Sequence, residues 1–137
     1  MPSSATLAAI GLLCLSLLVA LILGVDLMRF VARVPALTTA DHVDEYRRVV
    51  ARQMYGALFV LAMFIAAAAV MIVGTALELT SLFEWAYLVV LSGVIGVVGA
   101  WNKSVERKAK AITAEGEYAR QRDEIVHVWM KRPLPNW

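Results

Sequence analysis

Residues 59–73 read FVLAMFIAAAAVMIV and contain no polar side chain. The uncharged run extends in both directions to residues 53–77. About 20 residues of α-helix, at about 1.5 Å per residue, cross a hydrocarbon core of about 30 Å. Backbone groups inside lipid must be hydrogen-bonded within the segment, so the run must be helical. The stretch therefore predicts a membrane-spanning helix.

Two further runs resemble it in composition, and the second of them is shorter. One covers residues 5–26, and the other covers residues 85–101 between Trp85 and Trp101, the residue type that is enriched at membrane interfaces. We predict an all-α integral membrane protein in which residues 1–137 form a single membrane domain, with three transmembrane helices at residues 5–26, 53–77 and 85–101.

The overall composition agrees with this fold class. The chain of 137 residues is 61% hydrophobic and 18% charged, with a mean hydropathy of +0.70. A soluble domain of this size leaves too much of its surface exposed to hide so many apolar side chains. The single cysteine, Cys14, excludes a disulfide framework and any zinc or iron–sulfur site built on cysteines.

The basic residues predict an orientation. All 13 Lys and Arg residues lie in the loop 29–52 or in the tail 102–137, while the turn between the second and third spans carries only Glu78 and Glu84 as charged residues. Short segments rich in Lys and Arg stay on the cytoplasmic side. We therefore predict an exported N-terminus, a cytoplasmic C-terminus and a multi-pass location in a cell membrane, of the bacterial inner-membrane type.

The second and third helices are expected to extend into the cytoplasm. Thr38 or Thr39 can cap a helix that starts near Asp41 and runs without a break into the second span. Residues 102–114 contain neither proline nor glycine, so the third helix should continue through them until Gly116 interrupts it.

An apolar stripe follows the third span. Val105, Ala109 and Ile112 share one helical face and are expected to pack on the protruding part of the second helix. Residues 125–130 fit a helix and a short strand almost equally, and the sequence leaves both open.

No residue set predicts catalysis or metal binding. Nucleotide-binding loops, nucleophile elbows and paired catalytic carboxylates are absent. His42 and His127 lie outside the spans, so no histidine at membrane depth can ligate a haem or chlorin. We therefore predict a protein that is not an enzyme and no cofactor, although a lipid, pigment or quinone held by apolar contacts leaves no mark in a sequence.

Asp26 is the acidic residue nearest to membrane depth in the first span. An intramembrane carboxylate raises the hypothesis of proton or ion coupling. The simpler interpretation is an ion pair at the membrane interface, with Arg29 one turn further on or with Arg52.

Small residues mark two faces for helix packing. Such faces let two helix backbones approach closely, either within the chain or with a second copy or another subunit. The predicted helix-packing residues are Ser16, Ala20 and Gly24 in the first span and Ser92, Gly93, Gly96, Gly99 and Ala100 in the third.

The tail contributes two further candidate sites. Its basic residues can bind anionic lipid headgroups or act only as stop-transfer charge, and its large apolar residues are candidates for docking to a partner, as interface anchors often are. The headgroup candidates are Lys103, Arg107, Lys108 and Lys110, and the docking candidates are Trp129, Met130 and Trp137.

These features predict a non-catalytic accessory subunit of a larger membrane complex, of the respiratory, photosynthetic or transport type. Its partners would be other integral membrane subunits and membrane lipids, with a homo-oligomer possible and no nucleic acid. The alternative follows from topology: three spans with an exported N-terminus and a charged internal tail resemble the three-span phage holins. That resemblance implies a homo-oligomeric protein that forms pores or permeabilises the membrane.

Overall fold

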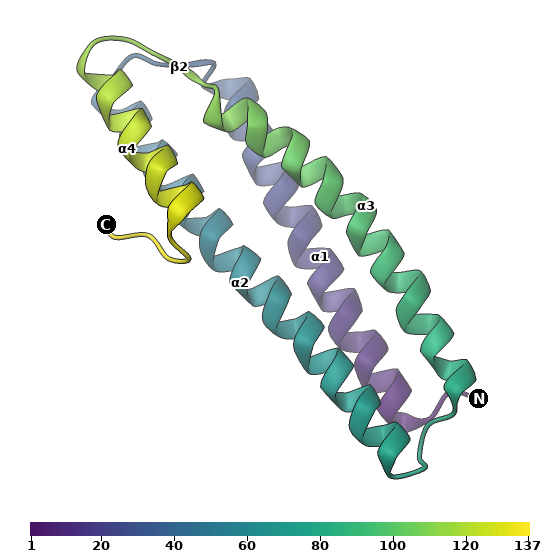
Figure 1. The fold of residues 1–137 in the computed structure, drawn as a ribbon. Coiled ribbons are helices and arrows are strands. Elements are labelled where there is room, and N and C mark those ends of the chain that lie inside the picture. Colours follow the sequence, from purple (N-terminus) through teal and green to yellow (C-terminus); the bar gives the residue numbers. More distant parts are fainter. The chain divides into compact units, whose positions relative to one another are not determined.

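The computed structural model describes residues 1–137, and its secondary structure is dominated by four α-helices (Figure 1). The helices α1, α2 and α3 are long and apolar enough to cross a membrane, which confirms the number and approximate place of the predicted spans. In chain order the elements are α1 (Ser4–Arg33), β1 (Ala36–Leu37), α2 (Ala40–Ala76), the 3-10 turn η1 (Leu82–Glu84), α3 (Trp85–Lys110), β2 (Thr113–Ala114) and α4 (Glu117–Lys131).

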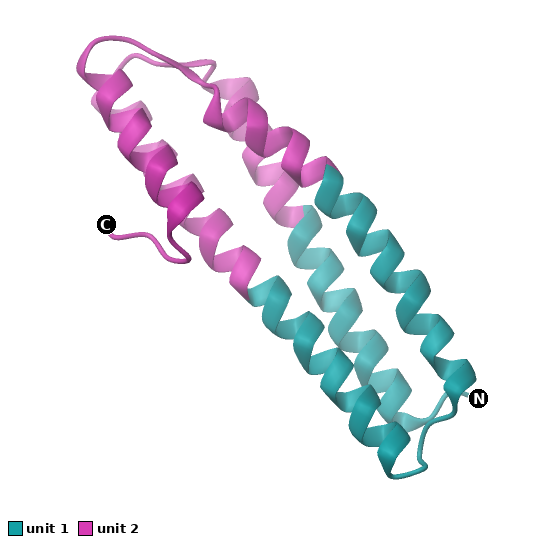
Figure 2. Cartoon of the chain, viewed as in Figure 1, with its two compact units in different colours: residues 1–21, 59–100 teal, residues 22–58, 101–137 magenta.

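The chain divides into two compact units, and each of the three long helices contributes to both (Figure 2). Unit 1 comprises residues 1–21 and 59–100, and unit 2 comprises residues 22–58 and 101–137. All 13 Lys and Arg residues belong to unit 2. The two units therefore differ sharply in charge.

Unit 1 holds its three helical segments together with a small apolar core and a few polar contacts. Ala9 and Leu13 of α1 meet Ala67 and Met71 of α2 and Leu88 of α3 in the core. At the end of α2, the indole Nε1 of Trp85 donates to Thr75 Oγ1 over 3.0 Å, and the Thr75 hydroxyl donates to the backbone carbonyl of Met71 over 2.8 Å.

In unit 1, polar groups cap the start of α1 and the turn that joins α2 to α3. Ser3 precedes α1 and its hydroxyl accepts a hydrogen bond from the Thr6 amide. The carboxylate of Glu84 accepts the amide of Ser3 at 2.7 Å and the amide of Ser81 at 3.0 Å. At the other end of the turn, α2 ends at Ala76, and Glu78 two residues later has a φ of 58°, in the left-handed region that usually favours glycine.

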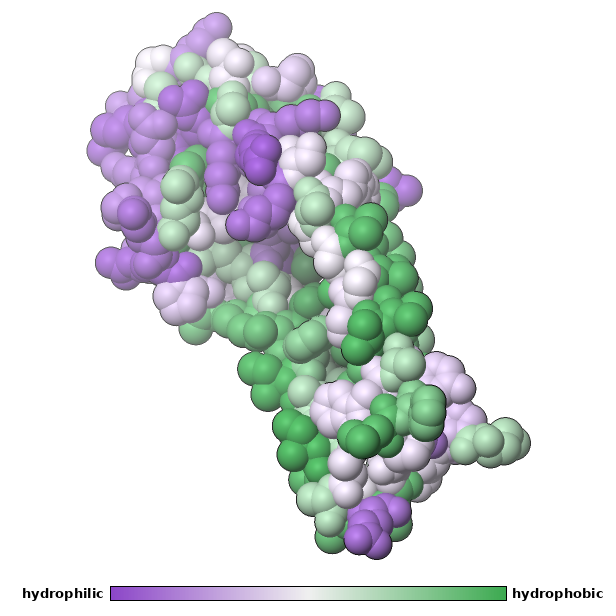
Figure 3. All heavy atoms as spheres, turned by 45° about the vertical axis from the view of Figure 1, so that its right-hand side comes forward, coloured by the Kyte–Doolittle hydropathy of each residue, from purple (hydrophilic) through white to green (hydrophobic).

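Most apolar side chains of the long helices lie on the surface. Only 28% of the most apolar 18-residue window of α1 is buried inside the protein, and the corresponding shares are 11% for α2 and 6% for the segment that includes α3. Hydrophobic side chains cover the helices of unit 1, whereas hydrophilic side chains gather around α4 in unit 2 (Figure 3). Contiguous apolar surface of this kind is found on proteins that face lipid or other proteins.

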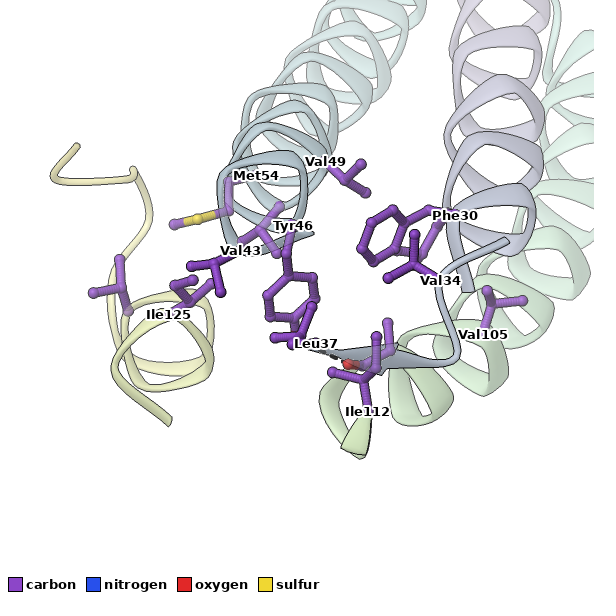
Figure 4. Close-up of a cluster of buried hydrophobic side chains, with 14 residues drawn as sticks. Phe30, Val34, Leu37, Val43, Tyr46, Val49, Met54, Val105, Ile112 and Ile125 are labelled. Atoms are coloured by element: carbon purple, nitrogen blue, oxygen red, sulfur yellow. Dashed lines mark hydrogen bonds between the residues drawn. The ribbon is translucent and has the colours of Figure 1, made fainter. Parts of the chain in front are cut away.

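Unit 2 has a dense core that involves all four helices. Tyr46 of α2 is fully buried, its ring stacks on Phe30 of α1 at 5.7 Å between centroids, and its hydroxyl donates to the backbone carbonyl of Ala109 of α3 over 2.8 Å (Figure 4). Burial raises the pKa of the Tyr46 hydroxyl, so it stays protonated as a donor. Ile125 brings α4 into the same cluster.

Several expectations for unit 2 are confirmed. Thr39 caps α2 by accepting the His42 amide at 3.2 Å, and α2 runs without a break from Ala40 into its apolar half. The stripe of Val105, Ala109 and Ile112 is buried in the same cluster as the first turns of α2. Gly116, with a φ of 55°, directly precedes α4, but it does not end the third helix, which already stops at Lys110.

Other expectations were wrong. The third helix ends at Lys110 instead of continuing to Ala114, because Thr113–Ala114 pairs with Ala36–Leu37 as a short parallel ladder. Residues 125–130 are helical within α4, so the strand interpretation fails. In the first case the deciding contact comes from a segment far away in the chain.

Candidate functional site

The small-residue face of α1 lies at contacts within the chain. Ser16 is fully buried in unit 1, where its hydroxyl donates to the backbone carbonyl of Val60 over 3.3 Å, and Ala20 is also buried. In unit 2 a Cβ atom at Gly24 would collide with the side chains of Trp101 and Asn102. Glycine is therefore required at position 24 by a close approach of side chains from α3.

The small-residue face of α3 is open. A Cβ atom added at Gly93, Gly96 or Gly99 would meet no other atom within 4 Å. Ala100 is exposed, and Ser92 is only half-buried. The three glycines of this face thus make no close packing contact, and small residues of this kind allow another helix backbone to approach closely.

Asp26 forms an ion pair with Arg52 in unit 2. The guanidinium Nε donates to one carboxylate oxygen at 3.1 Å and a terminal nitrogen donates to the other at 3.2 Å. Beside this pair, the buried amide of Gln53 donates to the backbone carbonyl of Leu23 over 2.8 Å. The ion-pair interpretation of Asp26 is confirmed, with Arg52 rather than Arg29 as the partner.

The basic residues that follow the third span separate into two kinds. Lys110 is held by Glu106 at 3.6 Å and lies over the ring of Trp129 at 4.8 Å from its centroid. The other candidates for lipid headgroups, Lys103, Arg107 and Lys108, are exposed. These three are free to meet a ligand or a membrane surface, whereas Lys110 helps to fix α4.

The predicted docking residues also differ in their surroundings. Trp129 is half-buried against the core of unit 2, and Met130 is 61% exposed. The indole of Trp137 donates to the backbone carbonyl of Arg47 over 3.2 Å, although 44% of the residue remains exposed. Trp137 therefore ties the chain end to α2 while still presenting an apolar surface.

A cavity of about 800 Å³ in unit 2 was not expected from the sequence. It is lined by residues of α2, of α4 and of the segment that follows α4, including Arg47, Arg132 and Trp137. Most of its lining lies between Arg120 and Trp137, and Arg47 of α2 closes it from 90 residues away, as the hydrogen bond between Trp137 and Arg47 illustrates. No local motif indicates that this end of the chain folds back on α2.

The two histidines lie in different places, one at the start of α2 and one in the wall of the cavity. Nδ1 of His42 accepts the amide of Thr38 at 3.3 Å in the first turn of α2, and His127 lines the cavity. No group of three or more His, Cys, Asp or Glu side chains is arranged to hold a metal ion.

Comparison with protein-family models, with curated proteins and with solved structures finds no match. What this chain does must therefore be argued from its own geometry and charge.

Proposed function

We propose that the chain is a non-catalytic accessory subunit of a larger membrane complex, of the respiratory, photosynthetic or transport type. The observation that carries the proposal is the open face of α3, where Gly93, Gly96 and Gly99 have no packing partner within the fold. On the same face Ser92, Gly96 and Ala100 lie four residues apart, and small residues at that spacing drive helix association in lipid because they allow close backbone contact. The α1 face of the same kind is already filled, so α3 is the side that would receive another transmembrane helix.

The distribution of charge supports an orientation for this subunit. Unit 1 carries Glu78 and Glu84 and no Lys or Arg, whereas unit 2 carries all 13 basic residues. By the positive-inside rule, unit 2 would lie on the cytoplasmic side of a bacterial inner membrane, with the N-terminus exported.

The end of α4 supplies a second contact for the complex. Met130 is exposed, and Trp129 and Trp137 each leave part of the ring accessible beside basic residues. Tryptophan and arginine are frequent anchors at protein interfaces. In this proposal the three residues bind the cytoplasmic part of a neighbouring subunit.

Purification through a tag at the N-terminus in mild detergent, followed by native mass measurement and identification of companions, tests the proposal. Stoichiometric companions that are lost in a Trp129→Ala, Trp137→Ala double variant are expected. Recovery of the chain alone as a monomer would refute it.

A second candidate is a homo-oligomeric, membrane-permeabilising protein of the holin type. It is favoured by the same α3 face, because two glycine-lined faces fit each other as well as they fit a foreign helix. A clean homo-oligomer in native mass measurement, together with dye leakage from reconstituted vesicles, would favour this candidate over the accessory subunit.

A further inference from the structure

The cavity in unit 2 has a surplus of positive charge on an otherwise mixed lining. Three arginines line it, together with Asp123 and Glu124. Asp123 is already engaged by Arg122 at 2.9 Å, and Glu124 is engaged by Arg120 at 3.2 Å. The two acidic residues therefore balance arginines of their own helix.

Arg120 is the most firmly occupied of the three lining arginines. It pairs with Glu117 as well as Glu124, and the hydrogen bond with Glu117 raises the pKa of its guanidinium. Arg47 has only Asp44 at 3.6 Å, and Arg132 has no acidic side chain within 4 Å. The charge available to a ligand comes from Arg47 on α2 and Arg132 at the end of α4.

Apolar side chains line the same cavity. Ile125, Val128 and the ring of Trp137 supply apolar lining next to the arginines. A volume of about 800 Å³ lies in the range of sites for small organic ligands, about 300–1,000 Å³. The lining thus matches an amphiphilic anion better than a bare inorganic one.

The distance along α2 between the cavity and the first exposed apolar residues fits the depth of a membrane headgroup layer. Tyr55 and Leu58 are the first large apolar side chains of α2 that are exposed, at 56% and 38%. Arg47 precedes Tyr55 by about 12 Å along the helix. The headgroup layer of one leaflet is about 5–8 Å deep, and a long arginine side chain can span the remainder.

We propose that this cavity binds the phosphate of an anionic phospholipid, held between Arg47 and Arg132, with the glycerol and upper acyl region against Trp137. Guanidinium groups form charge-assisted, often bidentate hydrogen bonds with phosphate oxygens. The site is distinct from the exposed residues Lys103, Arg107 and Lys108, which face outward from α3. It rests on the membrane insertion assumed in the proposed function, but not on the existence of a partner subunit.

The test is a titration of the full chain, purified in mild detergent, with phosphatidylglycerol in native mass spectrometry. Phosphatidylcholine with the same acyl chains is the control lipid, and millimolar sodium phosphate is the competitor. Each basic residue near an anionic lipid contributes about 1 kcal/mol, which is about fivefold in affinity. Arg47→Gln and Arg132→Gln should each weaken phosphatidylglycerol binding about fivefold, and the double variant about 30-fold.

Arg48→Gln is the matched control, because Arg48 is the neighbour of Arg47, is exposed and does not line the cavity. It should change binding less than about twofold. The hydrogen bond from Trp137 and the helical content should persist in Arg47→Gln, since Trp137 donates to the backbone carbonyl of residue 47 rather than to its side chain. Circular dichroism checks that each variant is folded.

Three results would overturn the proposal. Equal binding of phosphatidylcholine would remove the role of anionic charge, and equal losses in Arg48→Gln and Arg47→Gln would remove the role of the cavity. Displacement of phosphatidylglycerol by sodium phosphate would make the ligand a free anion. The proposed function fails on other measurements. Carbonate would then extract the chain from membranes, or purification would recover no companions.

Discussion

The same substitution, glycine to alanine, should have opposite effects at two positions that look alike in the sequence. Gly24 and Gly96 both belong to small-residue faces. At Gly24 the added methyl group would collide with the side chains of Trp101 and Asn102, whereas at Gly96 it would meet no atom within 4 Å. The pair therefore separates a filled helix contact from an open one.

The structure sets the size of each effect. Gly96→Ala removes only the conformational cost of glycine in a helix, so it should stabilise the isolated chain by about 0.5–1 kcal/mol. Gly24→Ala gains the same term but overpacks a contact with two side chains of α3, so it should destabilise unit 2 by about 1–3 kcal/mol. Both changes are measurable as shifts in the unfolding midpoint of the detergent-solubilised chain, followed by circular dichroism.

The larger variant Gly96→Leu connects this stability argument to the proposed function. It should leave the isolated chain folded, because its side chain projects into open space. It should weaken a partner helix docked on α3 by about 1–3 kcal/mol, which is about 5- to 150-fold in affinity. Val97→Leu is the control, since Val97 lies beside Gly96, is 72% exposed and is not part of the small-residue face.

The reasoning would be refuted by either of two results. A destabilised Gly96→Ala chain would mean that the α3 face is packed within the fold. Equal retention of companions in Gly96→Leu and Val97→Leu would mean that the glycine face does not receive a partner.

Three further changes test the internal contacts. Tyr46→Phe should cost about 0.5–1.5 kcal/mol in chemical unfolding, because the carbonyl of Ala109 loses the shorter of its two hydrogen bonds and keeps the one from the Ile112 amide at 3.4 Å, while the apolar packing is kept. An unchanged midpoint would contradict this. Glu78→Gly should raise the thermal unfolding midpoint by an amount equivalent to about 1 kcal/mol, because glycine adopts a φ of 58° without strain. Asp26→Asn should lower the free energy of unfolding by less than about 1 kcal/mol, because its ion pair with Arg52 is largely exposed. It should also leave the binding of companions intact. A complete loss of that binding would support a coupling role for Asp26.

The long apolar runs were sufficient to predict three helices that are long and apolar enough to cross a membrane, because this property depends only on the length and composition of each segment. The cap at Thr39 was also predictable, since it depends on neighbours within a few residues. The pairing of β1 with β2 and the end of α3 at Lys110 were not predictable, because each depends on segments that are distant in the chain.

The candidate sites divide in the same way. The sequence could place Gly24 and Gly96 on small-residue faces, but not say which face is already filled. It could identify Asp26 as an ion-pair candidate, while the choice of Arg52 over Arg29 depended on how α1 lies against α2 within unit 2. The cavity between Arg47 and Arg132 could not be predicted from the sequence, since it forms only where the C-terminal stretch folds back on α2.

By itself the sequence determined the elements: which segments are apolar enough to form long helices, and where every basic residue falls along the chain. Those properties are local, because they follow from the side chains within one or two turns. Only the tertiary structure decided which faces are buried and which remain available, since α1 and α3 both carry faces of Ser, Ala and Gly and the fold brings close neighbours to the glycine of α1 but not to those of α3.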